Sequence, residues 1–294
     1  MKTDEPDKFS DQTLLIVGRG SIGKKHEGNA RKLGVNVITV DPVAALQADY
    51  HTVREALSAQ KTDKISHALI ASPVGSHLSV LRELLQAGIP SILVEKPLVL
   101  PEEIVEAKVL ASNLTSQQVV VVGFNWRFNS AVQSLKQQLI EGRIGQVRVA
   151  QLWAREWLSR YGGHVVLESG SHIVDTARYI FGDLRLVGSH LSHFGLLGDS
   201  EEAATLLFEG RNGIHLSAHV NFINPSAYDY SILVQGDKDS LLVTPDRLEP
   251  MHEFELRAFL RHETGRLATI EDGLSNMDLI GSALQRFQEP TCAV

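Results

Sequence analysis

The stretch TLLIVGRGSIGKKHEGNARKLGVNVITVDP, residues 13–42, decides the fold. Apolar residues 14–17 are typical of a buried strand, and the glycine-rich segment GRGSIG follows at once. Residues 24–33 have the pattern of a helix, and residues 35–40 that of a second strand ending at Asp41. A strand, a glycine turn, a helix and a second strand in this order predict a βαβ unit with parallel strands.

Each glycine of GRGSIG meets a steric need of such a unit. Gly18 allows the tight turn off the strand, Gly20 lets a pyrophosphate approach the backbone, and Gly23 lets helix and strand pack closely. The N-terminus of the helix that follows then presents free N–H groups and the positive end of its dipole to the phosphates. We therefore predict that this segment binds a dinucleotide, the alternative being a glycine turn that binds nothing.

Asp41 indicates which dinucleotide binds. It falls close to the ~20 residues beyond the glycines at which an acidic residue is expected. A carboxylate there accepts hydrogen bonds from both ribose hydroxyls and repels a 2′-phosphate, so we expect NAD(H). Lys24 and Lys25 keep NADP(H) open as the alternative.

Strands and helices continue to alternate up to about residue 127. This alternation predicts an N-terminal Rossmann domain, residues 1–127, with a doubly wound parallel sheet. Ligands of such sheets bind at the carboxyl ends of the strands. The residues expected at those ends are Gly18, Asp41, Ser72, Pro73, Glu95, Lys96, Pro97, Asn125 and Arg127.

Residues 128–294 predict a second, α+β domain, and we expect its last helix to pack back towards the first domain. After a helix at 130–141, several segments with period-two patterning alternate with glycine or charged turns. This pattern favours an open, mostly antiparallel sheet with helices on one face, so the whole chain is of the α/β class. The uncovered face of the sheet must be buried somewhere, and we expect a homodimer or homotetramer to form through it.

Several motifs in order carry a family resemblance. They are GRGSIG, ASPVGSH, EKP at 95–97, GFNWRF at 123–128 and GGHVVLESGSHIVDTARYIFG at 162–182. With them the chain resembles the Gfo/Idh/MocA family of nicotinamide-dependent oxidoreductases from about residue 14 to residue 287. The resemblance implies that Lys96 lies beside the nicotinamide and moves a proton, and that His172 is an acid/base. Glu168 stands where family members commonly carry aspartate, four residues before His172 and on the same face of a helix.

The resemblance and the strand ends together give the expected site residues. The cofactor-binding residues are Gly18, Gly20, Ser21, Ile22, Gly23, Asp41, Ser72, Pro73, His77, Glu95, Lys96 and Arg127, and the substrate residues are Asn125, Arg155, Tyr161 and Asp175. For Asp175 we favour the alternative of an ion pair with Arg178. Arg155, Trp157, Arg160 and Tyr161 lie in a stretch that is shorter than in the family, and surface positions are the alternative for them.

The expected function is NAD(H)-dependent oxidation of a secondary alcohol of a sugar or cyclitol, or the reverse reduction. The alternatives are a non-catalytic dinucleotide sensor and a reductase of a non-sugar carbonyl or imine. Hydride transfer needs no metal, and the histidine pairs 190/193 and 215/219 match no metal motif.

The composition of the chain indicates which kinds of partner and which cellular compartment to expect. The formal net charge of -7 disfavours nucleic acid as a partner, because phosphate binding requires a basic face. The resemblance implies a small, sugar-like substrate instead. No run approaches the ~20 apolar residues of a membrane span, and the polar start resembles no signal peptide. The single cysteine, Cys292, suits a reducing compartment, so we expect a cytoplasmic protein.

Overall fold

The computed structural model describes residues 9–60, 62–156, 164–196, 198, 200–223 and 229–288, apart from the side chains of 63 and 286–288. The chain divides into two compact units. The first consists of residues 1–125 and 250–274, and the second of residues 126–249 and 275–294.

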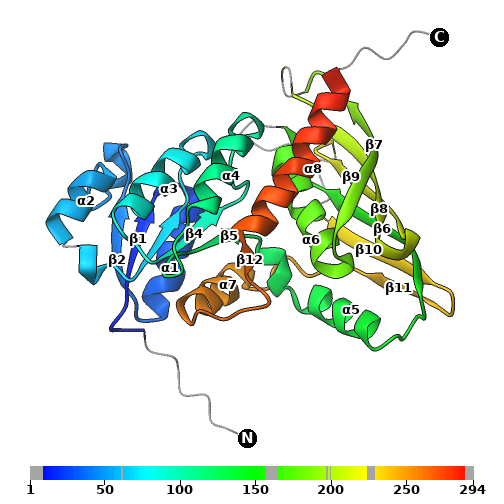
Figure 1. Ribbon diagram of the computed structural model, residues 1–294, viewed down its shortest axis with the longest axis horizontal. Coiled ribbons are helices and arrows are strands. Elements are labelled where there is room, and N and C mark those ends of the chain that lie inside the picture. The colour runs from blue at the N-terminus through cyan, green and yellow to red at the C-terminus, as the bar shows by residue number, and fades with distance from the viewer. Residues whose placement is uncertain are drawn as a thin grey trace, which may run out of the picture. The chain divides into compact units, whose positions relative to one another are not determined.

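The first unit is a six-stranded sheet with the order β12-β5-β4-β3-β1-β2 (Figure 1). All neighbouring strands run parallel except β12, which pairs antiparallel with β5. This confirms the predicted doubly wound sheet. The strands are β1 Thr13–Val17, β2 Asn36–Val40, β3 His67–Ile70, β4 Ser91–Glu95, β5 Val119–Gly123 and β12 Ala268–Thr269, and the helices are α1 Ser21–Lys32, α2 Val53–Gln60, α3 His77–Gln86, α4 Ile104–Ser112 and α7 Met251–Leu260.

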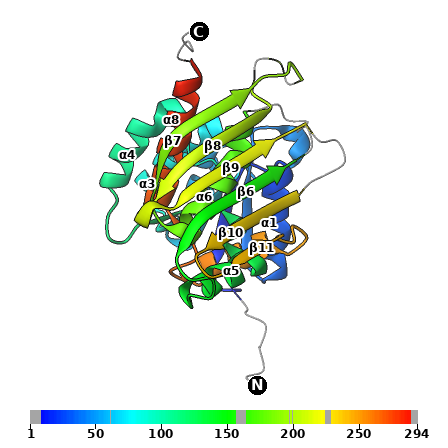
Figure 2. The same ribbon diagram turned by 90° about the vertical axis from the view of Figure 1, so that its right-hand side faces the viewer.

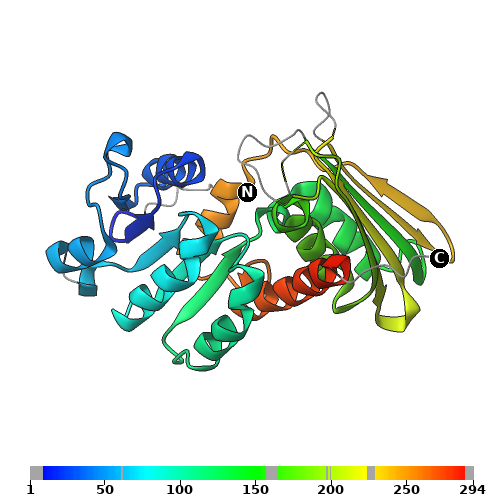
Figure 3. The ribbon, with the colours of Figure 1, turned by 90° about the horizontal axis from the view of Figure 1, so that it is seen from above.

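Helices cover both faces of this sheet, as a parallel sheet requires. The central strands β3 and β4 are buried along their whole length. Helices α1 and α7 share one face, where a buried cluster joins Ala30 of α1 and Leu33, the residue after α1, to Leu256 and Phe259 of α7. Figure 3 shows α3 and α4 on the opposite face.

Residues 250–274 belong to the first unit, whereas the predicted boundary placed them in the second domain, with only the last helix packing back towards the first. Two contacts account for the difference. Ala268 and Thr269 of β12 add a strand to the edge of the sheet beside β5, and α7 packs against α1. Neither pairing has a local signal, because the partners are more than 100 residues apart in the chain.

The second unit contains another six-stranded sheet, with the order β11-β10-β6-β9-β8-β7 (Figure 2). Its pairs are antiparallel except β6 with β9, which confirms the predicted mostly antiparallel sheet. The strands are β6 Val147–Arg155, β7 Leu184–Ser192, β8 Ala203–Gly210, β9 His215–Asn221, β10 Asp229–Gly236 and β11 Ser240–Val243, and the helices are α5 Ser130–Ile140 and α6 Ser171–Phe181, with α8 Ile270–Gln288 beginning in the first unit.

One face of this second sheet is buried and the other is not. Residues of β6, β9 and β10 alternate between buried and half-exposed along each strand. Helix α6 lies against the buried face (Figures 2 and 3). The other face displays exposed apolar side chains, among them Val187, Leu207 and Leu242.

The described residues contain neither a candidate membrane-spanning helix nor a candidate metal cluster. None of the helices there is both long and apolar enough to cross a bilayer. In the same part of the chain, no three His, Cys, Asp or Glu side chains lie close enough together to hold a metal ion.

We expect acid to destabilise the first unit through His67 of β3. Its ring is buried against Phe259 and His262, and burial lowers the pKa of His67 to about 4 from 6.5. Between these two values the unfolded chain binds a proton that the folded chain does not. The stability associated with neutral His67 is therefore fully present above pH 6.5 and is lost as the pH falls towards 4.

The variant His67→Leu tests this expectation by urea unfolding at pH 7 and at pH 4.5. The loss of stability between the two pH values should be smaller than in wild type, by on the order of 2 kcal/mol. An identical pH dependence in both proteins would contradict it.

Candidate functional site

The glycine turn between β1 and α1 is built for close backbone contacts. Gly18 has φ +97°, and a Cβ atom there would lie 2.4 Å from the amide nitrogen of Ser72. At Gly23 a Cβ atom would lie 1.9 Å from the carbonyl oxygen of Gly18. At Gly20, by contrast, a Cβ would meet nothing within 4 Å among the described residues, so the middle of the turn is open.

Helix α1 starts at this open point. Gly20 occupies its N-cap position in an extended conformation and has no side chain with which to cap the helix. The side chains of Ser21 and Ile22 are exposed. The first-turn N–H groups and the positive end of the helix dipole are therefore available to an anion such as a pyrophosphate.

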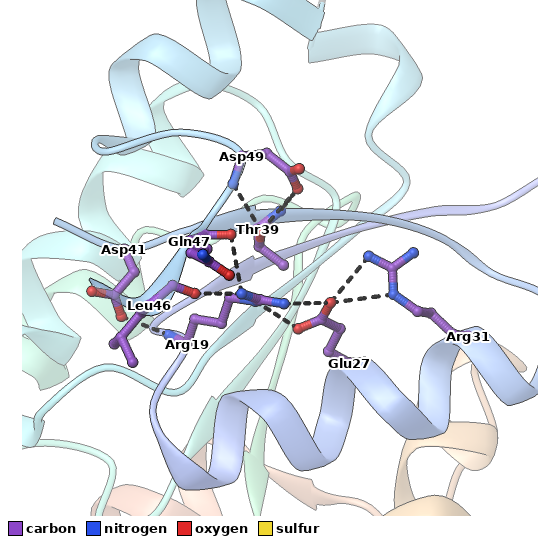
Figure 4. Close-up of polar contacts among 8 residues, drawn as sticks. All are labelled: Arg19, Glu27, Arg31, Thr39, Asp41, Leu46, Gln47 and Asp49. Carbon is purple, nitrogen blue, oxygen red and sulfur yellow. Dashed lines mark hydrogen bonds and ion pairs between the residues drawn. The ribbon is translucent and has the colours of Figure 1, made fainter. Parts of the chain in front are cut away.

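Asp41 lies at the end of β2, beside the same turn (Figure 4). Its carboxylate is buried and accepts hydrogen bonds from the amides of Arg19 (2.7 Å) and Val43 (2.8 Å). A carboxylate has about four acceptor positions, so two remain for ribose hydroxyls. Open turn, helix start and carboxylate together fit the expected dinucleotide.

The residues after β3 form a turn held by His77. The two ring nitrogens of His77 lie 2.8 Å from the carbonyl oxygen of Ser72 and 3.0 Å from that of Pro97. Burial lowers the pKa of this histidine, and the two carbonyl groups oppose that shift. His77 thus ties the end of β3 to the segment after β4. Ser72 is half-buried and Pro73 exposed at the surface of this turn.

Glu95, the last residue of β4, is a buried carboxylate with a histidine partner. Its Oε1 lies 2.7 Å from Nε2 of His26, on α1, and its Oε2 accepts the amide of Lys96 at 3.2 Å. Burial raises the pKa of Glu95, but the hydrogen bond with His26 and nearby positive charges outweigh it and hold the pKa at about 2. A Cβ on Gly123 of the neighbouring strand would lie 3.2 Å from this carboxyl group, so a larger residue there would press against Glu95.

Lys96 follows directly and is half-buried, with a cis peptide bond to Pro97. Nearby, the buried side-chain amide nitrogen of Asn125 lies 3.1 Å from the ring nitrogens of His252, on α7. Burial lowers the pKa of His252 to about 4. The first unit therefore gathers Lys96 and these polar groups at the carboxyl ends of its strands.

Sequence reasoning missed His26 and His252. A signal for His26 existed, because the buried residues 23, 26, 27 and 30 of α1 follow the three- and four-residue spacing of one helix face. His252 had no such signal, since its segment joins the sheet only through long-range contacts.

In the second unit, Glu168 and His172 are both half-buried. The regular helix begins at Ser171, and Glu168 lies in a π-helical turn, Val166–Gly170, before it. Such turns occur frequently at functional sites. The expectation that both side chains share one face of the helix stays a prediction.

Asp175 and Arg127 form a buried ion pair. The guanidinium of Arg127 contacts both carboxylate oxygens of Asp175, at 2.6 to 3.2 Å. Arg178, the expected partner of Asp175, lies 3.8 Å from Asp183 instead. The pair with Arg127 accounts for both buried side chains without a ligand, because a buried charge requires a partner.

Of the remaining predicted substrate residues, Arg155 ends β6 as an exposed side chain. It contacts Asp229, its cross-strand neighbour on β10, at 2.7 Å, which is a surface pair. Tyr161, Trp157 and Arg160 lie outside the described residues. A surface groove of about 690 Å³ beside α2, lined by residues 49–52, 54, 55, 58 and 59, contains none of the predicted site residues.

Family models match both parts of the chain. Residues 13–124 match the model described as "Oxidoreductase family, NAD-binding Rossmann fold", and residues 132–242 match the GFO/IDH/MocA C-terminal domain.

Individual proteins that the chain is similar to share less than 30% of its residues over the matched segments. Over 182 residues, 57% of this chain, the sequence is 29% identical to inositol 2-dehydrogenase of Rhizobium meliloti. Over 218 residues, 68% of this chain, it is 28% identical to D-apiose dehydrogenase of Paraburkholderia graminis. The matches cover 54% and 56% of those proteins, so the chain aligns with little more than half of their length. The structure of scyllo-inositol dehydrogenase from Lactobacillus casei with NAD(H) and scyllo-inositol has the same fold, with a TM-score of 0.76 at 20% identity over 94% of this chain and 96% of that one.

We expect Gly23→Ala to disrupt the dinucleotide site. The added methyl group would collide with the backbone at Gly18 and push α1 away from the turn. NADH affinity, measured by fluorescence titration, should fall by at least about tenfold. Gly28→Ala is the matched control, because a Cβ at Gly28 on the same helix meets nothing within 4 Å. That control should keep its affinity and gain roughly 0.5–1 kcal/mol of stability. Equal affinities for both variants would contradict the assigned role of Gly23.

Proposed function

Since this chain belongs to the Gfo/Idh/MocA family of NAD-binding oxidoreductases, we propose that it transfers hydride between NAD(H) and a secondary alcohol or ketone of a sugar or cyclitol. The substrate class follows the relatives that act on inositol and apiose. The observation that carries the proposal is the open glycine turn with Asp41 beside it, which fits a dinucleotide.

When bound, the nicotinamide supplies or accepts the hydride, and the protein supplies placement and charge. The first-turn amides of α1 hold the pyrophosphate, and Asp41 accepts hydrogen bonds from the ribose. Ser72 and Pro73 border this site from the end of β3. These groups orient the cofactor in the proposed enzyme.

Lys96 is the proposed proton carrier of the first unit. Its position directly after Glu95, whose carboxylate is held by His26, fixes the backbone from which the lysine side chain extends. A lysine takes the proton of a reacting hydroxyl in oxidation and returns it in reduction, and its ammonium form stabilises developing negative charge on oxygen. His172 is the proposed second acid/base, with Glu168 as its carboxylate, on the strength of the family resemblance.

We also propose that the protein assembles as a homodimer or homotetramer through the open face of the second sheet. Val187, Leu207 and Leu242 leave apolar surface there, which association would remove from water. Light scattering should give a mass that is a multiple of 32.3 kDa, and Leu207→Glu should lower it. A monomer in wild type would overturn this part of the proposal. The cytoplasmic location stays a prediction from the sequence.

The function is tested by cofactor titration followed by a substrate screen. The fluorescence of NADH should change on binding and reach saturation as the protein concentration rises. In a panel of sugars and cyclitols, at least one compound should then reduce NAD to NADH. Lys96→Ala should bind NADH normally and lose turnover by about 10²–10⁴-fold.

Lys108→Ala is the control, since Lys108 is an exposed lysine on α4 of the same unit. It should keep full turnover. If neither NADH nor NADPH binds, the proposed function is wrong. If Lys96→Ala and wild type turn over equally, the role of Lys96 is wrong while the cofactor assignment stands.

A further inference from the structure

The side chain of Arg19, in the glycine turn, makes several hydrogen bonds to the protein (Figure 4). Its Nε and Nη2 donate to the two carboxylate oxygens of Glu27, at 2.8 and 3.2 Å. Its Nη1 donates to the carbonyl oxygens of Leu46 and of Gln47, the latter at 3.0 Å. Four hydrogen bonds therefore direct the guanidinium towards α1 and the loop after β2.

Glu27 is the anchor of this arrangement. Its side chain is only 10% exposed and lies between Arg19 and Arg31, which contacts Oε1 at 3.1 Å. The hydrogen bond from Arg19 lowers the pKa of Glu27, with a further contribution from Arg31, and the same bond raises the pKa of Arg19. Both groups are thus charged together over the physiological range.

The position of Arg19 relates it to the ribose end of a dinucleotide. Its backbone amide donates to Asp41, and its guanidinium reaches the loop that follows Asp41. In dinucleotide-binding folds the acid at this strand end meets the ribose 2′-hydroxyl, and an arginine nearby accommodates the 2′-phosphate of NADP. Here such an arginine, Arg19, is present, but its guanidinium is already paired with the carboxylate of Glu27.

We propose that Glu27 determines cofactor specificity by holding Arg19 in this bidentate pair and so withholding its guanidinium from a 2′-phosphate. The inference rests on the proposed function, and it deepens it by assigning the NAD(H) preference to a residue on α1 in addition to Asp41.

The charge balance around Arg19 supports this role. Three carboxylates, those of Glu27, Asp41 and Asp49, are set against two guanidinium groups, those of Arg19 and Arg31. A 2′-phosphate would therefore add a dianion beside a group in which the carboxylates outnumber the guanidinium groups. Without the charge of Glu27, two cations face two carboxylates and both guanidinium groups lose their carboxylate partner.

The test is the variant Glu27→Gln, with NADH and NADPH titrated separately by nicotinamide fluorescence. Glutamine has nearly the same shape as glutamate but presents a single acceptor oxygen and no charge. It therefore cannot accept hydrogen bonds from both Nε and Nη2 of Arg19 on two oxygens. Wild type should prefer NADH. In the variant the ratio of the two dissociation constants should move towards NADPH by about tenfold or more, and this gain should shrink as salt is raised.

Arg19→Lys is a second, independent variant. A lysine cannot hold two carboxylate oxygens and two carbonyl groups at once, so it should also shift the ratio towards NADPH. Glu263→Gln is the matched control, because Glu263 pairs with Arg261 and Arg266 elsewhere in the first unit. That control should leave the ratio unchanged.

The outcomes separate the inference from the proposed function. If wild type binds neither dinucleotide, the proposed function itself fails. If wild type binds NADH but both variants weaken NADH and NADPH equally, Glu27 only supports the loop and the inference is overturned. A wild type that prefers NADPH would overturn it as well.

Discussion

The contact between Gly23 of α1 and the carbonyl of Gly18 is the constraint on which the first unit depends. A single Cβ atom at Gly23 would lie 1.9 Å from that oxygen, so the helix axis can come this close to the strand end only with glycine. The position of α1 in turn places His26 and Glu27 on its buried face. From there His26 reaches Glu95 on β4, and Glu27 reaches Arg19 in the turn. One close backbone approach thus sets the partners of several charged groups.

Buried polar groups at the strand ends are held by other protein groups. Glu95 pairs with His26, Arg127 pairs with Asp175, and His77 contacts two carbonyl oxygens. Removing one member of such a pair leaves an uncompensated buried charge or dipole, which is far more costly than losing an exposed ion pair. These residues therefore act first as fixed supports. In the proposed enzyme, the ligand of the first unit contacts Lys96, Asp41 and the open start of α1.

The local parts of the fold were predictable from the sequence. The strands and helices of residues 13–123 follow from short apolar runs, amphipathic spacing and glycine turns, and the glycine turn and Asp41 lie where the pattern places them. The prediction was wrong where the outcome depends on distant segments. Residues 250–274 belong to the first unit through β12 and α7. Similarly, Asp175 contacts Arg127, 48 positions away, whereas the expected partner was the residue one helical turn along.

By itself, the sequence determined the parallel βαβ architecture and the dinucleotide-binding turn. These depend on which backbone angles and close contacts each residue type permits, and Gly18 and Gly23 decide that locally. Only the tertiary structure decided which charges meet. Arg19 and Glu27 are eight positions apart, a separation that by itself predicts no contact. The turn between β1 and α1 nevertheless brings the guanidinium of Arg19 to the carboxylate of Glu27. The strength of an ion pair depends on distance and burial in three dimensions, and neither quantity is written in the order of the residues.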